Sequence, residues 1–507
     1  MSTLKSLVNV SHVGLLFQQE SSSNGVTSYA AYFVTAALFL FLAYSWRDQY
    51  PNLPRLNSKK ATEFTWRGRL LDYMERSRTL LEQGRRQFGG QPYNLFTDLG
   101  DTVIVPSKYA DELRSHRALE FGNAAADFTH RYIPGLAPFK NEPGFSTLVQ
   151  NNLTKALVNL TAPISAEASK ALRDVFTDSK EWTPVTPEDI MLVVSRMSSR
   201  VFMGEELWAF FNVLTQWPWS LRPWVHWFMP RFTAIRQQLA LCRQVLQPHI
   251  NHRLAVKEAA AAQGKPNPYN DSIEWFSREI RSKYDPTNVQ LSLTLVAIHT
   301  TTDLLTQTMM DIAKHPEILG SLREETLHVL RNNGLNKLAF QKLRLMDACL
   351  KESQRLRPIM LAYYRRKAVD DVTLRDGFTI KKGTIVAMDG REVMLKEVNY
   401  PEPLHWNPYR FLQMRETGEE NKAHLVSASD KHVGFGHGIH ACPGRFFAAN
   451  ELKIAMAHIL LKYDWKLADD ASDLPVAVGG STYMLPYGVK LLVARRQEEL
   501  DLDALEF

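Results

Sequence analysis

Cysteine is scarce in this chain of 507 residues, which has three: Cys242, Cys349 and Cys442. A small, odd number does not support a disulfide framework of the kind that small secreted domains use. The scarcity therefore indicates that most of the chain works in a reducing compartment. Hydrophobic residues make up 45% of the sequence and charged residues 22%, which is ordinary for a globular protein.

The sequence also lacks the signatures of two other protein classes. No dense block of Lys and Arg with interleaved aromatic residues is present, so no nucleic-acid partner is expected. The net charge of +6 favours anionic lipid or an acidic protein partner instead. The chain has no flavin domain and no dinucleotide-binding fingerprint. Any redox activity would therefore take its electrons from a separate protein.

Residues 29–46 form an uncharged, apolar run that is just long enough to span a bilayer as a helix. A signal peptide is the competing interpretation, but no small-residue cleavage site follows the run. Basic residues cluster after Trp46, and the positive-inside rule places everything that follows in the cytosol. We therefore expect a single-pass anchor in the endoplasmic reticulum membrane, in contact with lipid.

The anchor divides the chain into four parts. They are a lumenal segment (1–28), the transmembrane helix (29–46), a proline-containing hinge (47–63) and the remainder (64–507). Because proline fixes the backbone, Pro51 and Pro54 would orient the remainder against the membrane.

The stretch from Phe435 to Arg445, Phe-Gly-His-Gly-Ile-His-Ala-Cys-Pro-Gly-Arg, is the most informative in the chain. Pro443 stands where the first residue of a helix would be, so Cys442 is expected at a helix N-terminus. Unpaired amides and the helix dipole lower the pKa of a thiol there, which predicts a thiolate. A thiolate in a glycine-rich loop is typical of an axial haem ligand. Taken alone, a single cysteine is more often a small buried apolar residue.

The pattern Phe-x-x-Gly-x-His-x-Cys-x-Gly-Arg in this stretch resembles the haem-binding loop of the cytochrome P450 family. The resemblance implies a mainly α-helical fold with small β-sheets (α+β), preceded here by one N-terminal transmembrane helix. It also implies haem b as the cofactor and Cys442 as the axial ligand of its iron. Residues 64–507 would then form one haem-thiolate catalytic domain, although length alone suggests about three domains. The other residues that the resemblance assigns to the cofactor are Phe435, Gly436, Gly438, His440, Gly444 and Arg366.

Two haem contacts stay open at this point. Arg366 aligns with an arginine that binds a haem propionate in the family, but its neighbour Arg365 is not excluded. Many family members also carry a Trp-x-x-x-Arg pair that contacts a propionate. No such pair occurs between Phe145 and Leu160. Which residue replaces that contact is not evident from the sequence.

A helix capped by Asp285 and Pro286 is expected to run to about Lys314. In its middle it carries Ala-Ile-His-Thr-Thr-Thr-Asp, and three β-branched residues are poor helix formers. A threonine hydroxyl can bond to an earlier carbonyl and bend the helix, which opens a groove for dioxygen. Without the Cys442 loop, threonines packed on a buried helix would be the simpler interpretation.

The resemblance maps Thr300 onto the oxygen-activating threonine of the family. The residue before that threonine is usually Asp or Glu, whereas here it is His299, which can relay protons near neutral pH. Asp303, one turn later, is an alternative relay. The predicted catalytic residues are therefore Thr300, His299 and Asp303.

Glu352 and Arg355 lie three residues apart on one face of a helix expected at 346–356. Most such pairs are solvated and worth less than about 1 kcal/mol. In the family, however, Arg410 would join them in a buried cluster of two arginines and one glutamate. We expect this network to hold the scaffold behind the haem loop.

Several shorter elements follow from local signals. Strands are expected at 92–96 and 102–105, a hairpin around Arg-Asp-Gly at 375–377, and a loop over residues 119–145, which is rich in Gly, Pro and Phe.

The resemblance implies a monooxygenase that takes electrons from NADPH-cytochrome P450 reductase and oxidises an apolar small molecule. The motif variants are similar to those of fungal ent-kaurene oxidase-like enzymes, which favours an apolar polycyclic substrate in terpenoid, meroterpenoid or indole diterpene biosynthesis. Two alternatives stay open: a haem-thiolate isomerase or dehydratase that does not use dioxygen, and a non-catalytic haem-binding membrane protein.

Overall fold

The computed structural model describes residues 32–40, 50, 52–59, 63, 65–131, 144–198, 230–269, 271–279, 285–468, 477–484 and 488–505. The predicted lumenal segment and both ends of the predicted anchor lie outside the described residues. Residues 32–40 are helical, and their large apolar side chains are exposed. Among the described residues, no helix combines the length and the apolar character needed to cross a bilayer.

The structure is mainly helical with small sheets, which confirms the α+β part of the predicted fold class. The longer helices are α3 (Arg67–Phe88), α7 (Thr154–Phe176), α8 (Pro187–Ser198), α11 (Pro230–Ala262), α13 (Pro286–Lys314), α14 (Leu319–Asn333), α16 (Arg344–Leu356) and α20 (Arg445–Lys462). The shorter helices are α4 (Ala110–Leu113), α5 (Phe121–Phe128), α6 (Phe145–Leu148), α12 (Ser272–Glu279), α15 (Lys337–Lys342), α17 (Arg391–Met394), α18 (Tyr409–Glu416) and α19 (Glu420–Ala423).

The strands form four small sheets. They are β1 (Tyr93–Thr97), β2 (Gly100–Ile104), β3 (Leu119–Glu120), β4 (Thr183–Val185), β5 (Ala362–Ala368), β6 (Val372–Thr373), β7 (Thr379–Ile380), β8 (Ile385–Asp389), β9 (Tyr463–Leu467), β10 (Ala477–Gly479), β11 (Thr482–Met484) and β12 (Leu491–Arg495). The strand orders are β1-β2-β8-β5-β3, β4-β12-β9, β10-β11 and β6-β7. The β6-β7 pair is the hairpin that the Asp-Gly turn predicts.

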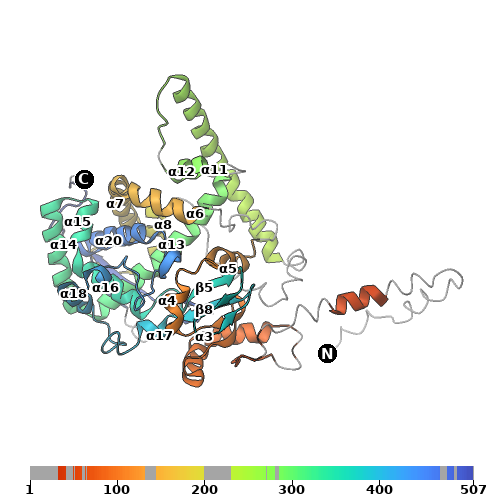
Figure 1. Cartoon of the computed structure of the whole chain (residues 1–507). Helices are drawn as coiled ribbons and strands as arrows, with labels where there is room; N and C mark the ends of the chain where they lie inside the picture. The colour runs from red at the N-terminus through yellow and green to blue at the C-terminus, as the bar shows by residue number, and fades with distance from the viewer. Residues whose placement is uncertain are drawn as a thin grey trace, which may run out of the picture.

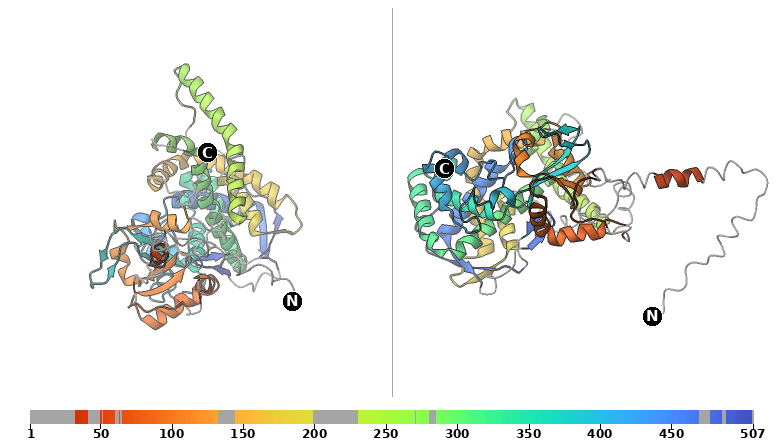
Figure 2. Two further views of the ribbon diagram at one scale, coloured as in Figure 1. Left: turned by 90° about the vertical axis from the view of Figure 1, so that its right-hand side faces the viewer. Right: turned by 60° about the horizontal axis from the view of Figure 1, so that its bottom comes forward.

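The helices and the five-stranded sheet occupy different parts of the molecule (Figure 1). Helices α14, α15, α16, α18 and α20 lie together, whereas β5 and β8 lie beside α3, α4 and α5, and α11 extends away from both parts (Figures 1 and 2). The largest apolar core joins α7, α8, α13, α14, α16 and α20, and residues such as Leu305, Leu350 and Ile454 are fully buried in it. The core thus surrounds the two helices, α13 and α20, that carry the predicted site.

Helix α13 begins where the sequence predicts. The side chain of Asp285 accepts hydrogen bonds from the amides of Thr287 and Asn288, and Pro286 is the first helical residue. Such a cap satisfies donors that the helix itself leaves unpaired. From this fixed start, α13 packs against α8, α16 and α20, and its threonines lie in the middle of the packed stretch.

The predicted loop over residues 119–145 is wrong in its first part. Leu119 and Glu120 form strand β3, and α5 follows directly. Leu119 pairs with Ala368 at the end of β5, a partner almost 250 residues further along the chain. A two-residue strand has no periodicity that a sequence pattern could reveal, so tertiary pairing alone decides it. Residues 132–143 lie outside the described part of the chain.

Candidate active site

The loop that contains Cys442 is shaped by two glycines with left-handed backbone conformations, Gly436 (φ 72°) and Gly438 (φ 81°). A Cβ atom on Gly438 would lie 2.1 Å from the carbonyl oxygen of Arg114. No side chain fits there, so the loop rests directly on the backbone at the end of α4. The sequence predicts glycine here so that a flat surface can come close to the backbone. In the structure, the surface that comes close to Gly438 is the backbone of Arg114.

Cys442 lies between this loop and α20. Its amide donates to the carbonyl of Phe435 across 2.7 Å, which closes the loop on itself. The helix begins at Arg445 with Gly444 as its cap, two residues later than the prediction that placed Pro443 first. The reason is local, because Cys442 already uses its amide in the loop. The amides of Gly444 and Arg445 nevertheless hydrogen-bond the sulfur, as the early helix position would require.

The prediction that the helix end lowers the pKa of this thiol is wrong for the protein alone. Burial raises the pKa of Cys442 above its ordinary value, although the amide of Gly444 and the charge and amide of Arg445 act in the opposite direction. The free energy needed to take a thiolate out of water exceeds the stabilisation that the first turn of a helix gives it. A coordinated metal ion changes this balance, because it deprotonates its thiol ligand.

The structure distinguishes Arg366 from Arg365, which the sequence leaves as alternatives for binding a haem propionate. Arg365 donates to the carboxylate of Asp98 across 2.9 Å. Arg366 instead faces the Cys442 loop and donates to the carbonyls of Leu113 (2.6 Å) and His437 (3.3 Å). Its side chain is 3% exposed, burial lowers its pKa to about 10, and it has no acidic partner among the described residues. Arg366 is therefore a buried cation that the described acidic side chains do not neutralise.

His440 and Phe435 complete the loop. The Nε2 atom of His440 donates to the carbonyl of Leu119 across 3.1 Å, so β3, which the sequence did not predict, holds this histidine. Burial lowers the pKa of His440, which favours its neutral form. Phe435 packs against the main apolar core that includes α20. The loop is thus fixed from both sides, by the end of β5 and by the core.

The middle of α13 carries the three predicted catalytic residues, His299, Thr300 and Asp303. The hydroxyl of Thr300 donates to the carbonyl of Val296 across 2.8 Å, the bond to an earlier turn that the sequence predicts. Asp303 lies three residues on, so its side chain follows that of Thr300 on the same helix face. Burial raises the pKa of Asp303 to about 7, against the guanidinium of Arg357, which lowers it. A carboxyl group with such a pKa can both hold and release a proton near neutral pH.

Glu352, Arg355 and Arg410 come together in one buried cluster. Arg355 donates to both carboxylate oxygens of Glu352 (2.7 and 2.8 Å), and Arg410 donates to the same carboxylate at 3.0 Å. The side chains of Glu352 and Arg355 are fully buried, and that of Arg410 is 10% exposed. Arg355 also donates to the carbonyls of Met394 and Pro403. The cluster therefore ties α16 to the irregular segment before α18.

The same helix, α16, also fixes the segment that leads into the haem loop. Lys351 is completely buried and donates to the carbonyls of His424 (2.6 Å) and Ser427 (3.0 Å). A Cβ atom on Gly434 would lie 2.2 Å from the side-chain oxygen of Gln354. Gln354 and Arg355 are therefore neighbours on α16 with two different contacts. Arg355 binds the segment before α18, and Gln354 contacts Gly434 at the start of the Cys442 loop.

Sequence reasoning missed a second buried acid. Asp347 accepts from the guanidinium of Arg415 (2.9 Å), the ammonium of Lys453 (2.6 Å) and the amide of Leu425 (2.8 Å). Burial alone would raise the pKa of Asp347, but Lys453, Leu425 and Arg415 together hold it below its usual value. Its partners lie about 70 and 100 residues away, so no local pattern indicates them.

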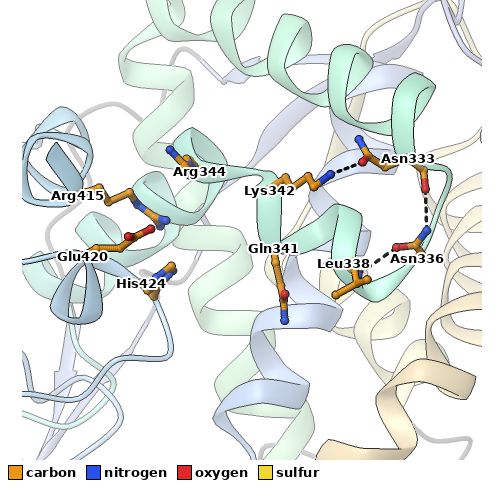
Figure 3. A pocket seen from close by; sticks show the side chains of 9 residues that line it. All are labelled: Asn333, Asn336, Leu338, Gln341, Lys342, Arg344, Arg415, Glu420 and His424. Atoms are coloured by element: carbon orange, nitrogen blue, oxygen red, sulfur yellow. Dashed lines mark hydrogen bonds between the residues drawn. The ribbon is translucent and has the colours of Figure 1, made fainter.

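A separate cavity of about 470 Å³ lies between α14, α15, α16 and the α18–α19 region (Figure 3). The residues that line it are Asn333, Asn336, Leu338, Gln341, Lys342, Arg344, Arg415, Glu420 and His424. Lys342 donates to the side chain of Asn333, and the side chain of Asn336 donates to the carbonyl of Asn333 across 2.6 Å. None of the predicted catalytic or haem-binding residues lines this cavity.

The family model described as "Cytochrome P450" matches residues 192–493. The chain belongs to the cytochrome P450 family. Cytochrome P450 monooxygenase eqxH of Fusarium heterosporum is 45% identical over 95% of this chain and 96% of its own length. Cytochrome P450 monooxygenase hepE of Aspergillus oryzae is 38% identical over 92% of this chain and 90% of its own. The retinoic acid-bound cyanobacterial CYP120A1 has a TM-score of 0.63 over 88% of this chain and 100% of its own; at 16% identity it shows the shared fold.

This cytochrome P450 is a monooxygenase with a haem cofactor and thiolate ligation of the iron, and the residues present fit that group. A partly exposed cysteine whose sulfur receives two backbone amides supplies the ligand. The unneutralised guanidinium of Arg366 beside the loop fits a carboxylate of the haem. Like other monooxygenases of the family, it uses a redox partner and an organic substrate.

The first prediction concerns the buried cluster. We expect Glu352→Gln to lower the free energy of unfolding by about 3–5 kcal/mol, because two arginines then share no buried counter-charge. The measurement is the midpoint of denaturant-induced unfolding. Glu324→Gln is the matched control: this residue is exposed on α14, and its change should stay within about 0.5 kcal/mol. Equal midpoints for the two variants would contradict the structural role of the cluster.

Proposed function

We propose that this cytochrome P450 is a membrane-bound monooxygenase that hydroxylates or otherwise oxidises an apolar polycyclic substrate in fungal secondary metabolism. Terpenoids, meroterpenoids and indole diterpenes are the substrate classes that we favour. NADPH-cytochrome P450 reductase is the proposed electron donor. The observation that carries the enzymatic part is the arrangement at the Cys442 loop. The loop is closed, the sulfur accepts two amides, and a buried arginine has no acidic partner in the part of the chain that the structure describes.

Fungal relatives support the substrate class only indirectly. Three monooxygenases from Fusarium, Aspergillus and Gibberella are 38–45% identical to this chain over most of its length. The motif variants around Thr300 and Cys442 resemble those of fungal ent-kaurene oxidase-like enzymes, which favours a large apolar ring system. The position that is oxidised depends on how several distant segments shape the pocket.

Each site residue has a proposed task. Haem, when bound, supplies the activation of dioxygen and the oxidation of the substrate. The sulfur of Cys442 holds the iron, and the amides of Gly444 and Arg445 stabilise negative charge on that sulfur. The guanidinium of Arg366 binds a haem carboxylate. The hydroxyl of Thr300 donates its proton to the carbonyl of Val296, and its oxygen keeps lone pairs that can accept a further hydrogen bond.

Asp303 is the proposed source of protons for Thr300. The carboxyl lies one turn after the threonine on the same helix, and its pKa of about 7 keeps it partly protonated at neutral pH. His299 precedes Thr300 and is the competing relay. The two differ in how activity should respond to substitution and to pH.

Cys442→Ala tests the reaction class. In the reduced, carbon monoxide-bound spectrum, we expect the parent chain to show the red-shifted Soret band of a thiolate ligand and the variant to lose it, because alanine supplies no sulfur. Product formation from an apolar substrate should require both NADPH and dioxygen. A histidine-type band that the variant retains would contradict thiolate ligation. Turnover without dioxygen would instead indicate an isomerase or dehydratase.

The proton relay predicts a pH dependence. A carboxyl that donates protons acts only below its pKa, so the product formed per NADPH should fall as the pH rises through about 7. Asp303→Asn should lower this ratio and flatten its pH profile, and Thr300→Ala should lower it at every pH, roughly tenfold or more. Thr308→Ala is the matched control, because Thr308 donates to Leu304 in the same way two turns further on. An unchanged profile in Asp303→Asn would favour His299.

We propose that residues 29–46 anchor the protein in the endoplasmic reticulum membrane with the catalytic domain in the cytosol. The exposed apolar side chains of residues 32–40 and the basic residues that follow the run support this. Deletion of residues 1–46 should move the protein from the carbonate-washed membrane pellet to the soluble fraction while the Soret band is retained. A truncated chain that stays in the pellet as firmly as the full chain would contradict the anchor.

A further inference from the structure

Strand β5 contains an irregularity directly before Arg366. Its pairing with β8 shifts register by one residue between Tyr363 and Arg366, so that Tyr364 and Arg365 of β5 stand opposite the single residue Ala387 of β8. One of them, Tyr364, has a φ of 55°, a left-handed conformation that is rare for a bulky side chain. Such conformations persist where surrounding contacts hold them, and they gather at functional sites.

The polar contacts of Tyr364 connect β5 to the Cys442 loop and to α4. The guanidinium carbon of Arg366 lies 4.5 Å from the centre of the tyrosine ring, within the range of a cation–π interaction. The hydroxyl of Tyr364 lies 3.4 Å from Nδ1 of His437 and 3.5 Å from the carbonyl oxygen of Ala110. The side chain is 7% exposed, so these contacts are shielded from water.

One arrangement of protons satisfies the whole group. Arg114 can only donate, so Nε2 of His437, 3.3 Å from its guanidinium, must accept. Neutral His437 then carries its proton on Nδ1 and donates it to the oxygen of Tyr364, whose own proton goes to Ala110. Burial and the charge of Arg114 lower the pKa of His437, which favours this neutral form.

His437 is therefore held at three points, and two of them depend on Tyr364. Arg366 donates to its carbonyl, Tyr364 accepts from its ring, and Arg114 donates to the other ring nitrogen. The next residue, Gly438, rests on the backbone of Arg114. Substitution of Tyr364 would thus release both the guanidinium of Arg366 and the entrance of the loop.

We propose that Tyr364 is a positioning residue for the haem: its bulged conformation aims the guanidinium of Arg366 at a haem carboxylate and holds His437 beside it. This rests on the haem-thiolate site proposed above. It gives a structural reason why the chain can lack the Trp-x-x-x-Arg pair between Phe145 and Leu160, since the β5 bulge would secure the contact of Arg366 with a haem carboxylate.

The test measures how fast the haem-loaded, full-length protein loses haem to an excess of apomyoglobin. We expect Tyr364→Ala to lose haem roughly tenfold faster, because the cation–π contact and the hydroxyl contacts both disappear. Tyr364→Phe keeps the ring and should lose haem about threefold faster at most. Tyr363→Phe is the matched control, since the adjacent hydroxyl is buried without a hydrogen-bond partner, and its rate should equal that of the parent.

A second measurement separates positioning from a general structural role. The same proteins are loaded with haem dimethyl ester, whose carboxylates are blocked. If Tyr364 acts through Arg366 on a carboxylate, the difference between parent and Tyr364→Ala should largely vanish with the ester. The same ratio with both haems, or equal rates for Tyr364→Ala and Tyr363→Phe, would overturn the proposal. Tyr364→Phe provides the readout if the alanine variant does not fold.

Failure here is distinguishable from failure of the haem-thiolate site. The Tyr364 variants keep Cys442, so they should retain the thiolate Soret band of the parent. Loss of that band in the parent itself would contradict the site, whereas an intact band with unchanged haem loss would contradict only the role of Tyr364.

Discussion

A single buried carboxylate, that of Glu352, joins helix α16 to α18 and to the irregular segment that precedes α18. Two arginines and the amide of Asn407 donate to it through four nitrogens, two of them on the fully buried Arg355. In a low-dielectric interior such a charge is tolerable only when it is fully bonded. Arg355 also donates to the backbone carbonyls of Met394 and Pro403. The irregular chain between α17 and α18 therefore takes its shape from this cluster. The Cys442 loop depends on that shape, since α16 holds both.

The buried arginines Arg355 and Arg366 differ in whether an acidic side chain balances their charge. This difference distinguishes the scaffold from the cofactor site. Arg355 has its counter-charge three residues away on its own helix, and its environment is complete within the protein. Arg366 is almost as deeply buried, yet its hydrogen-bond acceptors are carbonyls and its nearest stacking partner is a tyrosine ring. An uncompensated cation beside the loop is costly for the fold alone. A bound carboxylate removes that cost, which couples haem binding to stability.

Burial also sets the protonation states of two groups of the site. It outweighs the helix end and raises the pKa of Cys442, so thiolate formation is linked to binding of the iron. It also raises the pKa of Asp303 into the neutral range, where a carboxyl can serve as a proton donor. Neither shift follows from residue type, because each depends on how the fold buries the group.

The sequence by itself determined the class of protein, the cysteine that matters and the helices with strong local signals. Helix α13 starts at Asp285 because its cap is encoded in adjacent residues, and the Asp-Gly turn between β6 and β7 is equally local. Only the tertiary structure decided between Arg365 and Arg366, formed β3 within a predicted loop, and placed Tyr364, His437 and Arg114 together. These features pair residues more than 200 positions apart or depend on one bulge in a strand. A local sequence pattern indicates neither the long-range pairs nor the bulge, because the residues that stabilise them come close only in the folded protein.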